Sequence, residues 1–306
     1  MTEVSVVIPT KDRLPYLRRA IPMFLSHEQV MEIVVVVDGC QDGTADYLAT
    51  LAASDPRVRY VDNGRNRGLP YSRNRGIELA RCEYVFTGED DLELTDGFFE
   101  TLLSHMRDTA ADVISGRNIF RSESETAAEA VRRTDKLHGP AVDRRALTVE
   151  TGFAASTDQE QSLLPAPMLA RTEIFRKVGF GEEYEGNFWR EESDFQLSAL
   201  SHGYKLVYCP HAFSFNLVIE GDRGGVHAST GRSWVMYVIK NNWRFVNKHS
   251  ALIAEEFDIG NPRFYITKFA LHRICAHIIL PAIVRAKRRV FDLLGWAKNA
   301  GARKAA

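Results

Sequence analysis

The sequence predicts an α/β fold, in which a mainly parallel sheet is flanked by helices and followed by a helical C-terminal extension. Three observations support this prediction. Strand-like and helix-like segments alternate through the first third of the chain. The strand-like run 33–37 is wholly apolar, as in strands that are covered on both faces. From about residue 233 onward, the pattern becomes helical and aromatic.

The pattern of the first third of the chain predicts four strands and three helices. Apolar residues recur every three or four positions over 14–25, which predicts a helix. A second helix begins near Asp42 and Thr44, either of which suits an N-cap. This strand–helix alternation predicts parallel strands joined by right-handed crossovers. The expected strands are 4–8, 33–37, 58–61 and 84–87, and the expected helices are 14–25, 44–53 and 70–81.

The remaining chain is less regular. We expect strands at 165–169 and 205–209 and a helix over 194–201. The polar, weakly periodic segment 121–162 reads as a partly helical excursion that covers a site. A length of 306 residues suits one catalytic core with an appendage. We therefore predict a first domain over 1–232 and a helical region over 233–306.

The composition excludes several classes of protein. With 45% hydrophobic and 26% charged residues, the chain is not a disordered one. Its net charge of −1 argues against a nucleic-acid partner. The four cysteines are scattered, without a C-x-x-C pair, so neither a disulfide framework nor a thiolate zinc site is expected. The chain begins directly with a strand-like run, and we expect a cytoplasmic protein with reduced thiols.

The last segment of the chain combines apolar and basic residues. The stretch 265–284 contains Lys268, Arg273 and two histidines, so we do not expect it to span a membrane. The residues beyond it carry seven Lys and Arg against one Asp. Two interpretations stay open: peripheral contact with the inner face of a membrane, or a core-packing helix with a solvated tail.

Polar residues follow each of the first four predicted strands, at 10–13, 38–39, 63–67 and 89–91. Ligands of open α/β sheets bind beyond the carboxyl ends of the strands, so these clusters predict a ligand site. The alternative is that they are ordinary turns, which favour the same residue types. The dinucleotide fingerprint G-x-G-x-x-G and the P-loop motif are both missing after these strands, which argues against NAD binding and P-loop chemistry.

Two acidic clusters are the candidates for metal binding and for acid–base catalysis. The trio Glu89-Asp90-Asp91 offers hard oxygen ligands to a divalent cation, Mn²⁺ or Mg²⁺, that holds a diphosphate. The alternative for the trio is a solvated loop. The pair Glu191-Glu192 stands at a helix start, where carboxylates are favoured electrostatically, but it also suits a general base.

Five ordered motifs together resemble the family 2 glycosyltransferases, whose GT-A fold is a Rossmann-like sheet. They cover most of residues 4–215. The motifs are VSVVIPTKDR, VVVVDGCQDGT, NRGLPYSRNRG, FTGEDD, and APMLARTEIFRKVGF followed by WREESDFQLSAL. The sequence departs from the family's usual pattern twice, with a glutamate in the D-x-D site and with Glu-Glu in place of Glu-Asp.

The resemblance implies a role for each position. Asp38 would bind the base, Arg73 would serve the nucleotide or diphosphate, and Glu192 would be the general base beside Glu191. Which carboxylates of the trio hold the metal stays open; we favour Asp91, then Asp90, with Glu89 nearer the ribose. The remaining implied positions are Pro9, Thr10, Asp12 and Arg13 along the nucleotide-sugar, and His227 as a metal or diphosphate ligand on a closing loop.

The function so implied is an inverting transfer of a sugar from a nucleoside-diphosphate donor to an acceptor hydroxyl. UDP-linked donors are favoured because Asp38 suits a uracil-type N–H, and the acceptor is a glycan, a lipid-linked or a small molecule. One alternative, a sugar nucleotidyltransferase, needs a glycine-rich loop after the first strand, and 9–13 contains no glycine. The other alternative is a non-catalytic protein that binds nucleotide sugars on the same fold.

Overall fold

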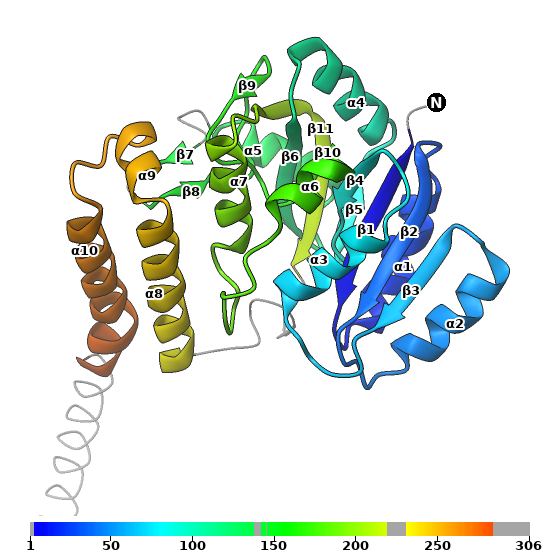
Figure 1. Cartoon of the computed structure of the whole chain (residues 1–306), viewed down its shortest axis with the longest axis horizontal. Helices are drawn as coiled ribbons and strands as arrows, with labels where there is room; N and C mark the ends of the chain where they lie inside the picture. Colours follow the sequence, from blue (N-terminus) through cyan, green and yellow to red (C-terminus); the bar gives the residue numbers. More distant parts are fainter. Residues whose placement is uncertain (1–2, 138–141, 145, 219–230, 284–306) are drawn as a thin grey trace, which may run out of the picture.

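The computed structural model describes residues 3–137, 142–144, 146–218 and 231–283. A nine-stranded sheet crosses these residues in the order β3-β2-β1-β4-β10-β6-β11-β5, with β9 paired to β11 (Figure 1). A separate two-stranded sheet joins β7 to β8. The strands are β1 (Val4–Thr10), β2 (Val30–Val37), β3 (Val58–Asp62), β4 (Tyr84–Thr87), β5 (Leu92–Leu94), β6 (Val113–Ser122), β7 (Val142–Asp143), β8 (Thr148–Val149), β9 (Gln159–Glu160), β10 (Met168–Arg171) and β11 (Leu206–Val218).

Helices cover both faces of the large sheet and continue beyond it as a C-terminal group. The helices are α1 (Leu14–Leu25), α2 (Thr44–Ser54), α3 (Leu69–Leu79), α4 (Phe98–Thr109), α5 (Ala127–Thr134), α6 (Thr172–Val178), α7 (Glu191–Ser201), α8 (Gly231–Lys248), α9 (Ser250–Glu256), α10 (Pro262–Ile274) and the π-helical turn η2 (Cys275–Ile279). The predicted α/β class, with its helical C-terminal extension, is thereby confirmed. The boundary between the two predicted domains stays a prediction.

Six strands of the large sheet point in one direction. β1 pairs in parallel with β2 and β4, β2 with β3, and β6 with β11, whereas β10, β9 and β5 run the opposite way. The strand order reverses on the two sides of β1, because β2 and β4 flank it. A ligand cleft in an open α/β sheet forms at such a reversal, beyond the carboxyl ends of the strands.

Alternation along β1 explains how the sheet is covered. Val4, Val6 and Ile8 face a core built with α1 and α4, whereas Val7 faces a second core built with α3, α6 and α7. On this second face α3 lies directly on the sheet. A Cβ added at Gly76 would come within 2.4 Å of the Val7 Cγ1 atom, so only glycine allows this close approach.

The sequence analysis missed one strand and the end of another in the middle of the chain. The central strand β6 was not predicted, because its polar residues Ser115, Arg117 and Asn118 point to buried positions and break the apolar run. The expected excursion 121–162 contains the end of β6, α5 and three short strands. β11 was expected to end at Cys209, but it continues past a register shift to Val218.

Buried polar contacts join α7 to the C-terminal helices. Asp194 of α7 is 1% exposed and accepts hydrogen bonds from the Lys248 Nζ and His249 Nε2 atoms, both at 2.8 Å. The loop that precedes α7 is held as well. Glu185 pairs with Lys240 at 2.6 Å and with Arg244 at 2.8 Å, so α8 braces both the entry and the first turns of α7.

Arg190, immediately before α7, adds a third contact. It adopts a left-handed backbone conformation, with φ at 86°, and its guanidinium is buried. The guanidinium donates hydrogen bonds to the Ala146 and Leu147 carbonyl oxygens and to the Asn242 side chain of α8. The start of α7 is therefore fixed by two segments that are far apart in the sequence, 146–147 and 240–249.

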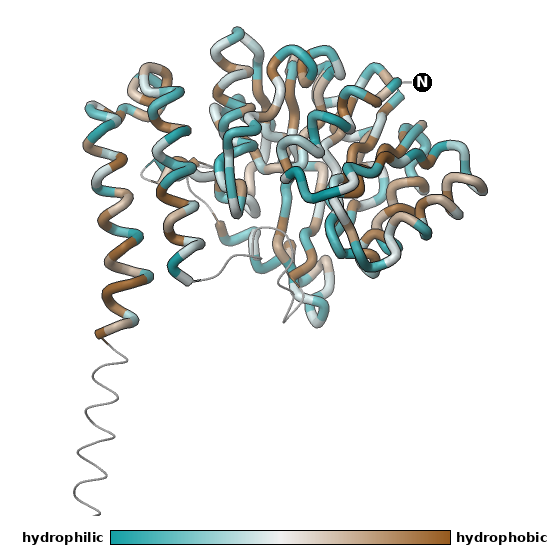
Figure 2. The backbone as a smooth tube through the Cα atoms, turned by 60° about the horizontal axis from the view of Figure 1, so that its bottom comes forward, coloured by the Kyte–Doolittle hydropathy of each residue, from teal (hydrophilic) through white to brown (hydrophobic). Residues whose placement is uncertain are grey.

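The helix 262–283, which comprises α10 and η2, lies against α8 at the edge of the molecule (Figure 1). By length and composition it is apolar enough to cross a membrane, although its charged residues led us not to expect a span. Only 6% of its most apolar stretch is buried in the structure. Hydrophobic residues recur along this helix toward its end (Figure 2).

We expect Asp194→Asn to reduce stability at pH 7 by roughly 1–3 kcal/mol, because it removes the charge that Lys248 and His249 face. Burial raises the pKa of Asp194, but hydrogen bonds from His249 and Lys248 more than offset this and hold the pKa below its usual range. A lowered pKa in the folded state means that the contribution is present above about pH 4 and is lost as the pH falls.

Chemical denaturation between pH 3 and pH 8 measures this contribution. The difference between wild type and Asp194→Asn should shrink toward the acid end. Asp108→Asn, on the exposed side of α4, is the control and should change stability by less than about 0.5 kcal/mol. An equal difference at every pH would contradict an ionic contribution of Asp194.

Candidate active site

The four predicted polar clusters do converge at one edge of the sheet. Thr10 ends β1, Asp38 follows β2, Asn63 follows β3, and Glu89 begins the segment after β4. The start of α7 meets the same edge through Arg73 of α3, which contacts both acidic clusters. The two groups of carboxylates that the sequence separates by about 100 residues therefore share one site.

Arg73 lies at the centre of this site. Its side chain is only 2% exposed, yet it carries a full charge among three carboxylates. Nη1 donates to Glu191 and, at 2.9 Å, to Glu192, and Nη2 lies 3.4 Å from Glu89. Burial lowers the pKa of Arg73, but the three surrounding carboxylates outweigh this effect and raise it overall. The guanidinium thus holds the base candidates and the acidic trio at a fixed separation.

Asn216 of β11 closes the other side of the trio. Its Nδ2 group donates to Glu89 at 2.8 Å and to Asp91 at 3.3 Å. The Asn118 side chain of β6 in turn donates to the Asn216 Oδ1 atom, which fixes the amide's orientation. The extension of β11 past its predicted end brings Asn216 here, so two neighbouring strands orient the amide that bridges the carboxylates.

The carboxylate of Asp90 is fully engaged within the protein. Its Oδ1 atom accepts a hydrogen bond from Arg13 Nε at 2.8 Å, and its Oδ2 atom accepts one from Thr10 Oγ1, also at 2.8 Å. The same guanidinium reaches Asp91, at 2.7 Å from Nη2 to Oδ2. Arg13 therefore straddles two members of the trio and offsets part of their charge.

The pKa values of the carboxyl groups of the site are shifted in different directions. Burial, with the neighbouring Asp91, raises the pKa of Glu89 to about 7, and burial raises that of Asp90 to about 7 despite Arg13. Burial also raises the pKa of Glu191 well above its usual range. Burial acts on Glu192 too, but Arg73 and Glu191 more than offset it, so the pKa of Glu192 is lowered. Glu192 is therefore the ionised member of its pair at neutral pH.

The trio fits a divalent cation better at two of its three positions. Glu89 and Asp91 keep about a quarter of their side chains exposed, with hard oxygen donors that Mg²⁺ or Mn²⁺ prefers. Burial is the main cause of the raised pKa of Glu89, and the nearby Asp91 raises it further, a contribution that a bound cation would offset. Asp90, by contrast, is buried and both of its oxygens are already bound.

Asp38 organises the loop after β3. It is 5% exposed and accepts hydrogen bonds from Asn63 Nδ2 and from the Arg67 and Gly68 backbone N–H groups, at 2.7–2.9 Å. Gly39 permits this arrangement. Its φ is +71°, and a Cβ there would lie 2.5 Å from the Asn66 nitrogen. The turn after β2 and the loop 63–68 therefore form one unit.

Asp12 lies further out on the same edge. It has a positive φ of 52°, accepts a hydrogen bond from the Gln41 N–H at 2.6 Å, and pairs with Lys11. Asp12, Cys40 and Asp42 bring their side-chain donor atoms within 4.8 Å of one another, as do His105, Asp158 and Cys209 at another place. Pro9, also predicted in the site, occupies β1 opposite Val36.

The sequence analysis missed one residue of the site, and one residue that it predicted lies outside the described residues. The analysis included Asn63 in the polar cluster 63–67 but gave no role to Asn216. Asn216 lies in the part of β11 beyond Cys209, where the strand was expected to have ended. His227 lies outside the described residues, so its predicted role stays a prediction.

The sheet of this chain is similar to solved glycosyltransferase structures. The crystal structure of S. aureus TarS 1–349 in complex with UDP-GlcNAc superposes with a TM-score of 0.57 at 15% identity, covering 84% of this chain and 71% of that one. The structure of TarS 1–349 without this ligand in its description gives a TM-score of 0.55. At this identity the likeness shows the fold, which is the expected GT-A fold.

The family model described as "Glycosyl transferase family 2" matches residues 5–177, which is more than half of the chain. The chain therefore belongs to glycosyltransferase family 2. Glycosyltransferase GlyG of Streptococcus pneumoniae is 28% identical over 123 residues, or 40% of this chain and 41% of that protein. A GalNAc(5)-diNAcBac-PP-undecaprenol beta-1,3-glucosyltransferase of Campylobacter jejuni is 28% identical over 131 residues, or 42% of each chain. The match spans about two fifths of these relatives' length.

We expect Arg73→Met to reduce the free energy of unfolding by about 3–5 kcal/mol, because it leaves the buried Glu191 carboxyl without its partner. Chemical denaturation at pH 7 measures this effect. Arg65→Met, at an exposed position of the loop after β3, is the control and should change stability by less than about 0.5 kcal/mol. Equal stability of the two variants would show that Arg73 is not a structural counter-ion.

Proposed function

We propose that this protein is an inverting glycosyltransferase that transfers a sugar from a nucleoside-diphosphate donor to an acceptor hydroxyl. One observation carries the proposal: the buried Arg73 guanidinium contacts Glu89 on one side and Glu192 on the other. A group that holds the donor diphosphate and a group that accepts the acceptor's proton must lie this close for a single displacement. Family membership supports the same reaction class.

Glu192 is the general base of this proposal. Its side chain is 25% exposed, whereas Glu191 beside it is buried, so only Glu192 can meet an acceptor hydroxyl. Its lowered pKa keeps it ionised at neutral pH. Glu192 removes the hydroxyl proton while the oxygen attacks the anomeric carbon, opposite the departing diphosphate, which inverts the configuration. Glu191 and Arg73 hold the carboxylate in place.

The donor is bound along the carboxyl edge of the sheet, and UDP-linked hexoses are the favoured class. Thr10, Arg13 and Asp38 line the position of the nucleotide in this proposal. The solved relative TarS binds UDP-GlcNAc, as its description states, which supports a UDP-linked donor here. Asp38 still has lone pairs available for a base N–H beyond those it uses on its own loop.

A divalent cation, Mn²⁺ or Mg²⁺, belongs to the proposal, with Asp91 and Glu89 as its ligands. When bound, such a cation supplies Lewis-acid stabilisation of the departing diphosphate. Asn216 would orient both carboxylates, because its amide already contacts each of them. Asp90 would keep Arg13 in position instead of binding the cation.

The acceptor is a glycan, a lipid-linked or a small molecule, and we favour a lipid-linked one. The relative from Campylobacter jejuni is described as acting on an undecaprenol-linked substrate, which supports this class. A cytoplasmic enzyme would meet such an acceptor at the inner face of the membrane. The excursion after β6 and the helices α8–α10 lie next to α7, so they are placed to shape the acceptor side.

We expect Glu192→Gln to retain donor binding and to lose at least a hundredfold in transfer rate, because the amide cannot take up the acceptor's proton. Binding is measured by the thermal shift that UDP-GlcNAc produces, and transfer by UDP release in the presence of acceptor. Glu78→Gln, at an exposed position near the end of α3, is the matched control and should transfer normally. Transfer by Glu192→Gln near the wild-type rate would remove this residue from the mechanism.

We expect EDTA to abolish both transfer and the thermal shift given by UDP-GlcNAc, and Mn²⁺ to restore them. The Asp91→Asn variant should need at least tenfold more Mn²⁺, because it loses one carboxylate ligand. Full turnover in EDTA would contradict the metal role of the trio. Release of pyrophosphate from UTP and a sugar phosphate would instead favour the nucleotidyltransferase alternative.

A further inference from the structure

Exposed apolar side chains gather on the C-terminal helices. Of the thirteen large hydrophobic residues that are exposed in the described part of the chain, seven lie between 236 and 283. They are Met236 and Trp243 of α8, and Phe264, Leu271, Ile279, Leu280 and Ile283 of the helix 262–283. We call these seven residues the apolar face. Exposed apolar side chains that gather in one part of a protein often mark a contact with a partner or a membrane.

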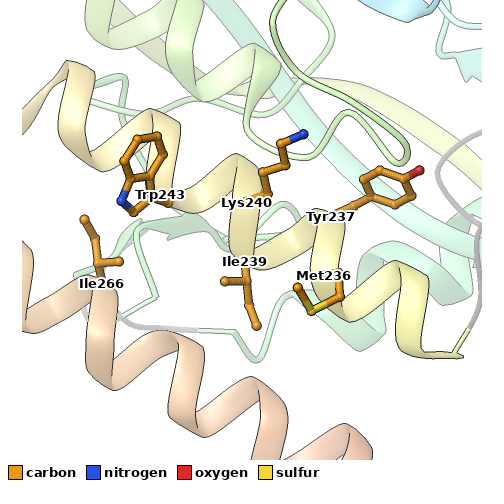
Figure 3. Close-up of a pocket in the computed structure, with 6 residues that line it drawn as sticks. All are labelled: Met236, Tyr237, Ile239, Lys240, Trp243 and Ile266. Atoms are coloured by element: carbon orange, nitrogen blue, oxygen red, sulfur yellow. The ribbon is translucent and has the colours of Figure 1, made fainter.

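A groove runs between the two helices beside this face. It has a volume of about 310 Å³ and an almost wholly apolar lining, which Figure 3 shows. Its lining residues are Met236, Tyr237, Ile239, Lys240, Trp243 and Ile266. In Figure 3, the Met236, Ile239 and Ile266 side chains lie between the two helices, whereas Lys240 and Tyr237 point toward the neighbouring loop. The groove therefore extends the apolar face toward the rest of the protein.

The charge of the chain is divided sharply at the same place. Residues 262–306 contain ten Lys and Arg against one Asp, which gives a net charge of +9. The preceding 261 residues contain 29 Lys and Arg against 39 Asp and Glu, which gives −10. Within the helix 262–283 itself there is no acidic residue. The helix 262–283, which carries most of the apolar face, thus belongs to the strongly basic part of the sequence.

We propose that the apolar face, together with Arg263, Lys268 and Arg273 of the same helix, docks this protein on an anionic lipid surface. Apolar side chains enter the acyl boundary, while Lys and Arg meet lipid phosphates. Trp243 suits this role, because tryptophan favours the interface between lipid and water. The long side chains of Lys268 and Arg273 can bury their methylene groups and still reach the headgroups.

Two other occupants fit less well. In a symmetric dimer the same surface meets itself, so Arg263, Lys268 and Arg273 would face the like charges of the second copy, with no acidic residue on the helix 262–283 to pair with them. A membrane-spanning helix would place Lys268, Arg273 and two histidines in the hydrocarbon layer without an acidic partner on the same helix. A surface position satisfies both the apolar residues and the charges.

Docking would also orient the proposed active site. Tyr237 packs on Gly186, where an added Cβ would lie 2.3 Å from the ring, and Lys240 pairs with Glu185. Gly186 and Glu185 lie in the loop that precedes the general-base candidate Glu192 by only a few positions. The preference for a lipid-linked acceptor rests on the proposed function, whereas the docking itself does not depend on catalysis.

Vesicle flotation tests the docking. The full chain should float with vesicles of 70% phosphatidylcholine and 30% phosphatidylglycerol at 0.1 M salt, and at least tenfold less with pure phosphatidylcholine. Substitution of both Trp243 and Leu271 by Ser should reduce binding at least tenfold, because both large apolar side chains are lost. Tyr60→Ser, an exposed aromatic position on β3, is the matched control and should bind as wild type does.

A second variant separates the electrostatic contribution. Replacing the exposed Arg263 and Lys268 by Gln should weaken binding to the anionic vesicles on the order of thirtyfold, since each basic residue near such a surface contributes about 1 kcal/mol. Salt at 0.5 M should weaken wild-type binding in the same direction. Glu192→Gln should bind vesicles normally, so a failure of the proposed catalysis would leave this result intact.

Three outcomes would overturn the docking. The first is equal flotation of wild type and both variants, or no flotation with anionic vesicles. The second is a stable dimer in light scattering that the Trp243 and Leu271 substitutions dissociate, which would assign the apolar face to a second copy. The third is retention in the vesicles after extraction with alkaline carbonate, which would indicate a spanning helix.

Discussion

The whole site depends on one buried cation. Arg73 contacts Glu89, Glu191 and Glu192, the last of them 119 residues further along the chain, and it is the one positive charge these contacts share. A buried guanidinium of this kind is expensive to desolvate and is retained only where several acidic partners surround it. Its position on α3 is fixed in turn by Gly76, which lets the helix lie directly on the sheet. Backbone packing and site electrostatics are therefore linked through a single helix.

The different properties of the carboxyl groups follow from that arrangement. Glu191 and Glu192 are neighbours in sequence, but one is buried and favours the neutral form while the other reaches solvent and favours the charged form. Pairs of acids whose environments push their pKa values apart are a recurrent sign of acid–base chemistry. The first turn of α7 also contributes its positive helix end to both. Contacts from α8 then keep this turn from moving relative to the sheet.

The sequence predicts the alternating first third well, because strong apolar periodicity defined elements such as α1, found at its expected bounds. Convergence of the polar clusters follows from parallel topology alone, so the edge carrying Thr10, Asp38 and Glu89 could be predicted. β6 could not, because buried polar residues conceal its strand pattern. For the same reason the contact of Asn216 with the trio was missed. The shared role of Arg73 was also invisible, since long-range ion pairs leave no local signal.

The loop after β3 is held in place by hydrogen bonds within the protein. Asp38 already satisfies the N–H groups of Arg67 and Gly68 and the amide of Asn63, and the close turn at Gly39 leaves this loop no room to collapse inward. A molecule that binds against it would meet a preorganised wall and would lose little affinity to the ordering of the chain. Selectivity at this surface would then depend on shape and hydrogen-bond complementarity instead of on induced folding. A small change in the structure of the ligand would therefore change its affinity directly.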